Sequence, residues 1–136
     1  MAITRLDHYS IRTTDLDATR RFYTEVLGLR VGPRPDFAFP GVWLYQGDAA
    51  VVHVVGVDPN DPSGLHDYLG DKGTDAARGT GTIDHVSFVG TDPDQLRTHF
   101  KAANMPFRER VVPSLNLSQL FVEDPNGVTI ELNFPH

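Results

Sequence analysis

Two histidines stand at equivalent places in an internally repeated sequence. The segment Leu6–Ile11 (LDHYSI) returns as Ile83–Phe88 (IDHVSF), so that His85 follows His8 by 77 residues. The similarity continues into the residues that follow each copy. Imidazole is the commonest side-chain ligand of metals in proteins. A repeat that duplicates an imidazole therefore predicts a metal site built between the two halves of the chain.

Two further side chains extend this candidate site. When Ala50–Val54 (AVVHV) is aligned with Val128–Leu132 (VTIEL), with the first hairpin one residue shorter, His53 and Glu131 occupy equivalent positions. Each half then supplies two potential ligands. The chain contains no cysteine, so a metal must be bound by nitrogen and oxygen atoms. Such ligands suit one divalent ion of Fe, Mn, Ni, Co or Zn.

Each of the four residues also has a structural interpretation. A single histidine on a strand is usually packed or hydrogen-bonded, but the duplication of His8 and His85 favours a ligand role. Glu131 alternates with Ile130 and Leu132, so the alternative for it is a solvated sheet face. His53 lies within an apolar run and is either a neutral ligand or a buried core histidine. The symmetry of the repeat leads us to include it.

The elements that must position these residues repeat as well. We expect strands at 3–12, 29–31, 42–46 and 50–55 with a helix at 16–27, and then strands at 82–89, 107–112, 117–123 and 128–134 with a helix from Pro93 to about Ala103. Thr14 or Asp15 and then Asp92 supply N-caps, and Gly28 ends the first helix. The predicted fold is α+β, with two tandem β-α-β-β-β modules whose mixed sheets curl around a shared cleft.

The domain organisation follows from this repeat and from the length of 136 residues. We expect a single domain over 1–136, with module 1 at about 1–56 and module 2 at about 82–136. A linker rich in glycine, proline and aspartate joins them at about 57–81.

Composition bounds the partners. The net charge of −6 gives no basic surface for nucleic acid. No apolar run is long enough to span a membrane and no secretory leader is present, so we expect a cytoplasmic protein with no membrane partner.

A small-molecule substrate is the expected partner, and the loop at 32–41 is its expected wall. Phe37, Phe39 and Trp43 are aromatic residues in or beside this proline-stiffened loop, where they either line a pocket or cap the core. Asn116 and Gln119 are expected on the strand before that of Glu131 and are candidates for polar contacts with the substrate.

The chain resembles the vicinal oxygen chelate superfamily, which includes glyoxalase I, extradiol dioxygenases and bleomycin-resistance proteins. The resemblance is carried by Leu6-Asp7-His8, by Arg21–Leu29 (RFYTEVLGL) and by Asp124–Leu132 (DPNGVTIEL). It implies that His8, His85 and Glu131 match the usual divalent-metal ligands and that the protein forms a homodimer. Position 53 matches the fourth ligand of glyoxalase-like members, where a carboxylate or an amide is usual, so a histidine there is a departure.

The number of ligands separates the possible reactions. Four protein ligands on an octahedral ion leave two positions for two neighbouring substrate oxygens, which favours proton transfer by Glu131 in a lyase or isomerase. If His53 only packs, two histidines and one carboxylate remain, which is the ligand set of Fe(II) oxygenases and fits a ring-cleaving dioxygenase. A third possibility is a metal-free protein that sequesters a ligand. We expect the lyase or isomerase first.

Overall fold

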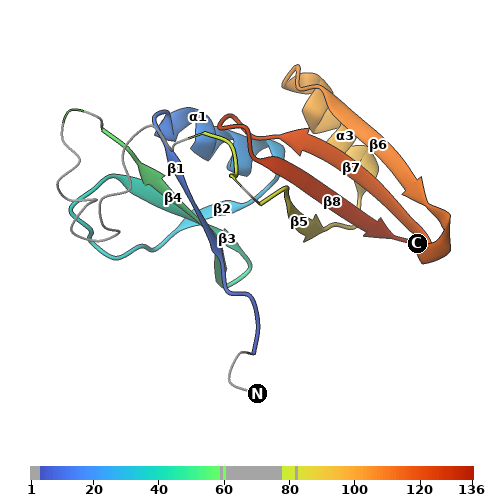
Figure 1. The fold of residues 1–136 in the computed structure, drawn as a ribbon, viewed down its shortest axis with the longest axis horizontal. Coiled ribbons are helices and arrows are strands. Elements are labelled where there is room, and N and C mark those ends of the chain that lie inside the picture. The colour runs from blue at the N-terminus through green and yellow to red at the C-terminus, as the bar shows by residue number, and fades with distance from the viewer. Residues whose placement is uncertain (1–3, 59, 61–77, 82) are drawn as a thin grey trace.

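The computed structural model describes residues 4–58, 60, 78–81 and 83–136, and these form two four-stranded sheets. Figure 1 shows the sheets side by side along the long axis of the chain. Module 1 runs from blue to green and module 2 from yellow to red. The linker expected at 57–81 lies largely outside the described residues.

Module 1 contains one helix and four strands. The helix α1 continues into a π-helical turn, η1, and so covers most of the helix predicted at 16–27. The elements are β1 (Tyr9–Thr13), α1 (Leu16–Arg21), η1 (Phe22–Val26), β2 (Arg30–Gly32), β3 (Gly41–Gln46) and β4 (Ala49–Gly56).

Module 2 repeats this order, with one additional short 3-10 helix, η2, before its third strand. The elements are β5 (Val86–Val89), α3 (Pro93–Ala102), β6 (Phe107–Val112), η2 (Pro113–Leu115), β7 (Leu117–Glu123) and β8 (Thr129–Pro135).

The two sheets have the same topology. The strand orders are β1-β4-β3-β2 and β5-β8-β7-β6, and the first strand of each module pairs in parallel with the last. The remaining pairs are antiparallel. This arrangement confirms the predicted α+β class with two tandem β-α-β-β-β modules. It also leaves β1 and β5 as edge strands, each preceded directly by one of the repeated histidines.

The repeated sequence produces equivalent caps and equivalent core positions. Asp15 accepts a hydrogen bond from the Ala18 backbone N–H at the start of α1, as Asp92 does from Gln95 at the start of α3. Tyr23 and Phe100, which correspond in the repeat, both have 0% exposed surface and belong to one core cluster. The helices are thereby packed onto the same face of their respective sheets.

A buried polar contact connects the modules. Asn126, in the turn between β7 and β8, accepts a hydrogen bond from Thr13 Oγ1 (2.7 Å) and donates one to Thr19 Oγ1 (2.9 Å). Tyr23 donates to Asp124 Oδ2 across 3.0 Å. In Figure 1 the β7–β8 turn accordingly lies beside α1. These contacts help to fix the side-by-side placement of the sheets.

Two details differ from the expected elements. The first strands begin later than predicted, so His8 and His85 lie immediately before β1 and β5. Asn116 follows η2 with a positive φ of 52° and precedes β7, where we had placed it on the strand. No helix in the described part of the chain is long and apolar enough to cross a membrane.

Candidate metal centre

Module 2 brings two of the predicted ligands together. His85 Nε2 lies 3.0 Å from Glu131 Oε2, and the Glu131 side chain is 14% exposed. Two donors that bind one ion at right angles, each about 2.1 Å from it, are separated by about 3.0 Å. The observed separation therefore fits a shared divalent ion, with imidazole nitrogen and carboxylate oxygen as its donors.

Each of the repeated histidines is bound by the aspartate that precedes it. Asp7 Oδ2 lies 2.6 Å from His8 Nδ1, and Asp84 Oδ2 lies 2.9 Å from His85 Nδ1. A carboxylate on one ring nitrogen fixes the tautomer and leaves Nε2 for a metal, which is how metal-binding histidines are commonly held. We had not assigned a role to these aspartates, although the Asp-His dipeptide in both copies of the repeat was the available signal.

Gln119 holds the other oxygen of Glu131. Gln119 Nε2 donates hydrogen bonds to Glu131 Oε1 and, across 2.9 Å, to Asn133 Oδ1. Gln119 itself is only 8% exposed. We had predicted a substrate contact for Gln119, and the structure places it against the candidate ligand. Because Oε1 of Glu131 accepts this hydrogen bond, Oε2 is the oxygen that faces His85 and could bind a metal.

Charge in module 2 favours a protonated His85. The hydrogen bond to Asp84 raises the pKa of the imidazole above its usual value, and the nearby charge of Glu131 raises it further. In the metal-free protein the two carboxylates thus stabilise the protonated form of His85. A metal that binds Nε2 must displace that proton.

Module 1 brings its two candidate ligands together in a different way. The rings of His8 and His53 are stacked, with centroids 3.6 Å apart and planes inclined by 14°. Trp43 stacks on the other side of His53, with centroids 3.9 Å apart. His53 Nε2 lies 3.1 Å from the carbonyl oxygen of Ala50. The nitrogen lone pairs of each imidazole lie in the plane of its ring. Because the two ring planes are nearly parallel, the lone pairs of His8 and His53 do not converge on one ion in this arrangement.

Burial favours a neutral His53. Desolvation lowers the pKa of its imidazole, and the charge of His8 lowers it further. A neutral ring that donates Nε2–H to a carbonyl has only Nδ1 left as a donor atom for a metal. The contacts of His53 are thus those of a packed residue, while His8 keeps Nε2 available.

Within one chain the two pairs do not form one site. Among the residues that the structure describes, which include all four candidates, no group of three or more histidine, cysteine, aspartate or glutamate side chains is close enough to hold a metal ion. His8 and His53 belong to module 1, and His85 and Glu131 belong to module 2. A site with His8, His85 and Glu131 therefore requires another arrangement of modules, such as a second copy of the chain.

The predicted aromatic wall lies beside the module 1 pair. Phe37 and Trp43 line a cavity of about 580 Å³ together with His8 and His53. Phe39 is only 8% exposed and stacks on Phe37, but it also reaches a smaller neighbouring cavity of about 90 Å³. Asn116 is not part of either cavity, since its amide donates to the backbone oxygen of His136.

The family model described as Glyoxalase/Bleomycin resistance protein/Dioxygenase superfamily matches residues 5–132. No curated protein sequence matches the chain.

Several solved structures have a similar fold. A putative glyoxalase family protein from Bacillus anthracis has a TM-score of 0.72 at 19% identity, over 100% of this chain and 98% of that one. Lactoylglutathione lyase from Agrobacterium tumefaciens has a TM-score of 0.63 at 22% identity, over 97% and 94%. TnmS3, an antibiotic binding protein from Streptomyces sp. CB03234, has a TM-score of 0.66 at 19% identity, over 100% and 99%. Identities this low establish a shared fold and no more.

Proposed function

The chain belongs to the glyoxalase/bleomycin resistance protein/dioxygenase superfamily, and we propose that it is a divalent-metal-dependent enzyme that acts on a substrate with two neighbouring oxygens. The observation that carries this proposal is the pair of Asp-His dyads, in which each aspartate holds Nδ1, together with a glutamate whose Oε2 lies 3.0 Å from His85 Nε2. We assign the metal to His8, His85 and Glu131.

We further propose that two copies of the chain complete each site. His8 comes from one copy and His85 with Glu131 from the other, because one chain holds them on separate sheets. Large apolar side chains next to the two histidines support a contact there: Leu6 is 88% exposed, Ile83 60% and Val89 76%. Exposed apolar residues beside edge strands are typical of surfaces that another chain covers.

The reaction that we propose first is proton transfer, in a glyoxalase-like lyase or isomerase, because Glu131 is an oriented carboxylate beside His85. A divalent ion bound by these residues supplies a Lewis acid for two neighbouring substrate oxygens. Glu131 is the proton acceptor in this reaction, and the hydrogen bond from Gln119 to Oε1 keeps its largely buried carboxylate in one orientation. Asp84 holds the His85 ring in place through Nδ1.

A second candidate is an Fe(II) ring-cleaving dioxygenase, and the position of His53 favours it. Since His53 is stacked between His8 and Trp43, two histidines and one carboxylate remain for the metal. That set leaves room for a chelating substrate and O₂. The metal content separates the two candidates: stoichiometric Fe(II) with O₂ uptake on catechols supports the dioxygenase, and Ni, Co, Mn or Zn supports the lyase or isomerase.

The experiment that tests the shared site is complementation between two inactive variants. His8→Ala and Glu131→Ala are each expected to lose stoichiometric metal when purified anaerobically. Mixed and allowed to exchange subunits, they form heterodimers in which one of the two sites has all three ligands. Elemental analysis of the mixture is expected to recover about a quarter of the wild-type metal.

Two other results would contradict the proposal. If the mixture recovers no metal, the site is not shared between copies. If the wild-type protein binds no metal and takes none up on titration, both enzyme candidates fail, and a protein that sequesters a small molecule remains.

A further inference from the structure

The ligand face of the module 2 sheet carries a second group of residues that the proposed metal site does not use. Phe121 on β7 pairs with Glu131 on β8, and Arg108 on β6 pairs with Phe121. Directly opposed residues of antiparallel strands point to the same face. Arg108, Phe121 and Glu131 therefore form one row across the sheet, on the face that carries the candidate ligand.

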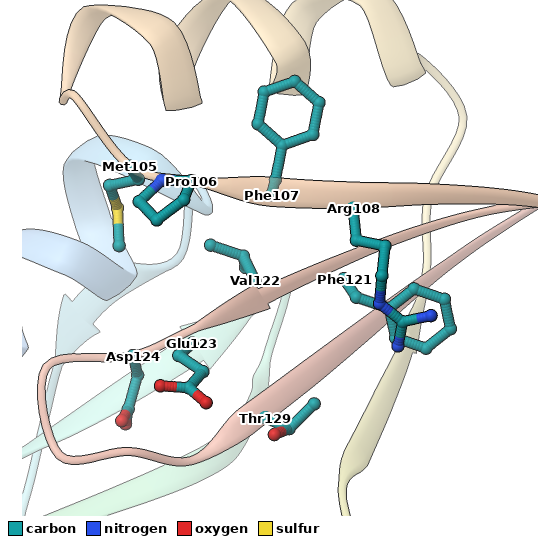
Figure 2. Close-up of a pocket in the computed structure, with 9 residues that line it drawn as sticks. All are labelled: Met105, Pro106, Phe107, Arg108, Phe121, Val122, Glu123, Asp124 and Thr129. Carbon is teal, nitrogen blue, oxygen red and sulfur yellow. The ribbon is translucent and has the colours of Figure 1, made fainter.

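Arg108 and Phe121, two members of this row, line a cavity of about 560 Å³ at the open edge of the sheet. Figure 2 shows Arg108 beside the ring of Phe121 at one end of the cavity, and Glu123 with Asp124 at the other. The Arg108 guanidinium carbon is 4.3 Å from the centroid of the Phe121 ring. The cation thus lies over the ring of Phe121, the middle residue of the row.

Arg108 has no anionic partner in the part of the chain that the structure describes; its recorded interaction is with the ring. Glu123 lines the same cavity but does not form an ion pair with Arg108. A guanidinium that stacks on an aromatic face keeps its in-plane N–H donors for a second partner, and their fork matches a carboxylate. Arg110 adds a second positive charge to this face of β6.

Module 1 contains a corresponding pair in which the cation is occupied. Arg30 on β2 pairs with Tyr45 on β3, and its guanidinium carbon is 5.1 Å from the Tyr45 centroid. Here, however, Nη2 donates to the Gly47 carbonyl oxygen across 2.8 Å. The same arrangement therefore binds the chain's own backbone in module 1 and leaves the cation available in module 2.

We propose that Arg108 and Phe121 form a subsite for a carboxylate group of the substrate. This inference rests on the proposed function for its second anchor, the metal beside Glu131. Two strand spacings separate the backbones of Arg108 and Glu131, roughly 10 Å. The substrate class is therefore a molecule with vicinal oxygens at one end and a carboxylate at the other, joined by a short and preferably planar arm that lies along Phe121.

Matched probes test this subsite. We would titrate the full-length Co(II)-loaded protein with 3,4-dihydroxycinnamate and with its neutral methyl ester, following the cobalt absorption and the heat of binding. The wild-type protein is expected to bind the acid about tenfold more tightly than the ester, which is the effect of one charge-assisted hydrogen-bonded contact. Arg108→Met is expected to abolish that preference by weakening the acid alone.

Arg30→Met is the matched control, because it removes the equivalent stacked arginine from module 1, and it is expected to keep the full preference for the acid. Arg108→Lys, which retains the charge without the fork, is expected to keep part of it. Equal binding of acid and ester by the wild-type protein, or an unchanged preference in Arg108→Met, would overturn the subsite.

The two readouts of this titration, the cobalt absorption and the heat of binding, separate this inference from the proposed function. If the cobalt absorption does not respond to either probe but the Arg108-dependent preference for the acid persists, the carboxylate subsite stands and the chelation of vicinal oxygens fails. If both probes perturb the cobalt absorption and bind with equal affinity, chelation stands and the carboxylate subsite fails.

Discussion

Module 1 and module 2 have the same topology and the same Asp-His dyad, but they surround the dyad differently. In module 1 the partner on the last strand is His53, which is packed into an aromatic stack with His8 and Trp43. In module 2 the partner is Glu131, which belongs to a hydrogen-bonded row with Gln119. The same fold thus places His8 against stacked aromatic rings and His85 against the carboxylate of Glu131.

The difference shows that the residue on the last strand decides what each dyad can do. Burial and the charge of His8 lower the pKa of His53, while the hydrogen bond to Asp84 and the charge of Glu131 raise the pKa of His85. The first environment suits a planar substrate beside the metal, and the second suits the removal of a proton. A site that joins one half from each module would combine both properties.

Removing Glu131 is expected to produce the largest effect. Glu131→Ala should reduce turnover by roughly 100- to 10,000-fold, because it deletes both a ligand and the proton acceptor. Steady-state assays and metal content measure this loss. Glu25→Ala, which removes an exposed glutamate from η1, is the control and should leave turnover unchanged. Full activity in Glu131→Ala would remove Glu131 from the mechanism.

The two dyads are expected to contribute alike if both imidazoles bind the metal. Asp7→Asn and Asp84→Asn each remove the carboxylate that holds Nδ1, and each should weaken metal binding by about 10- to 100-fold. Competition with a chelator of known affinity measures both changes. A loss in Asp84→Asn with none in Asp7→Asn would show that His8 is not a ligand.

Much of the fold could be predicted from the sequence because local signals and the repeat agreed. Capping aspartates, the glycine after the first helix and the alternation of the strands each specify an element within a few residues of chain. The repeat then places Tyr23 and Phe100 at equivalent core positions without any tertiary information.

The contacts of the candidate site depended on register and on the packing of the modules, which the sequence pattern does not specify. His53 meets Trp43 only because β3 and β4 pair in the observed register, with an irregularity between Leu44 and Tyr45. Gln119 reaches Glu131 along a diagonal between β7 and β8. The separation of the two pairs depends in part on buried contacts around Asn126 that join residues more than 100 positions apart.

Replacing His53 by phenylalanine tests the role of the stack. His53→Phe retains a flat ring between His8 and Trp43 but has no nitrogen, so metal affinity should stay within about twofold if His53 only packs. A ligand role predicts a loss comparable to that of the aspartate variants, about 10- to 100-fold. Chelator competition distinguishes these results, and His53→Ala, which opens the stack, shows how much the packing contributes to unfolding free energy.

The smallest effect is an opposite pH dependence of stability in the two modules of the metal-free protein. The raised pKa of His85 gives a stabilisation that is complete below its ordinary value of 6.5 and is lost as the pH rises through the higher folded value. The lowered pKa of His53 acts in the other direction, since stability is lost as the pH falls below 6.5. Each contribution should be below about 1 kcal/mol, because both side chains are partly exposed to solvent.

Single variants separate these two contributions in urea unfolding between pH 5 and pH 8. His53→Phe should leave the His85 contribution, so that its unfolding free energy falls more steeply than that of the wild type as the pH rises. His85→Gln should leave the His53 contribution, and its unfolding free energy should rise with pH relative to the wild type. If both variants keep the wild-type pH profile, the two imidazoles do not differ in environment, and the contrast between an aromatic and a charged half-site is wrong.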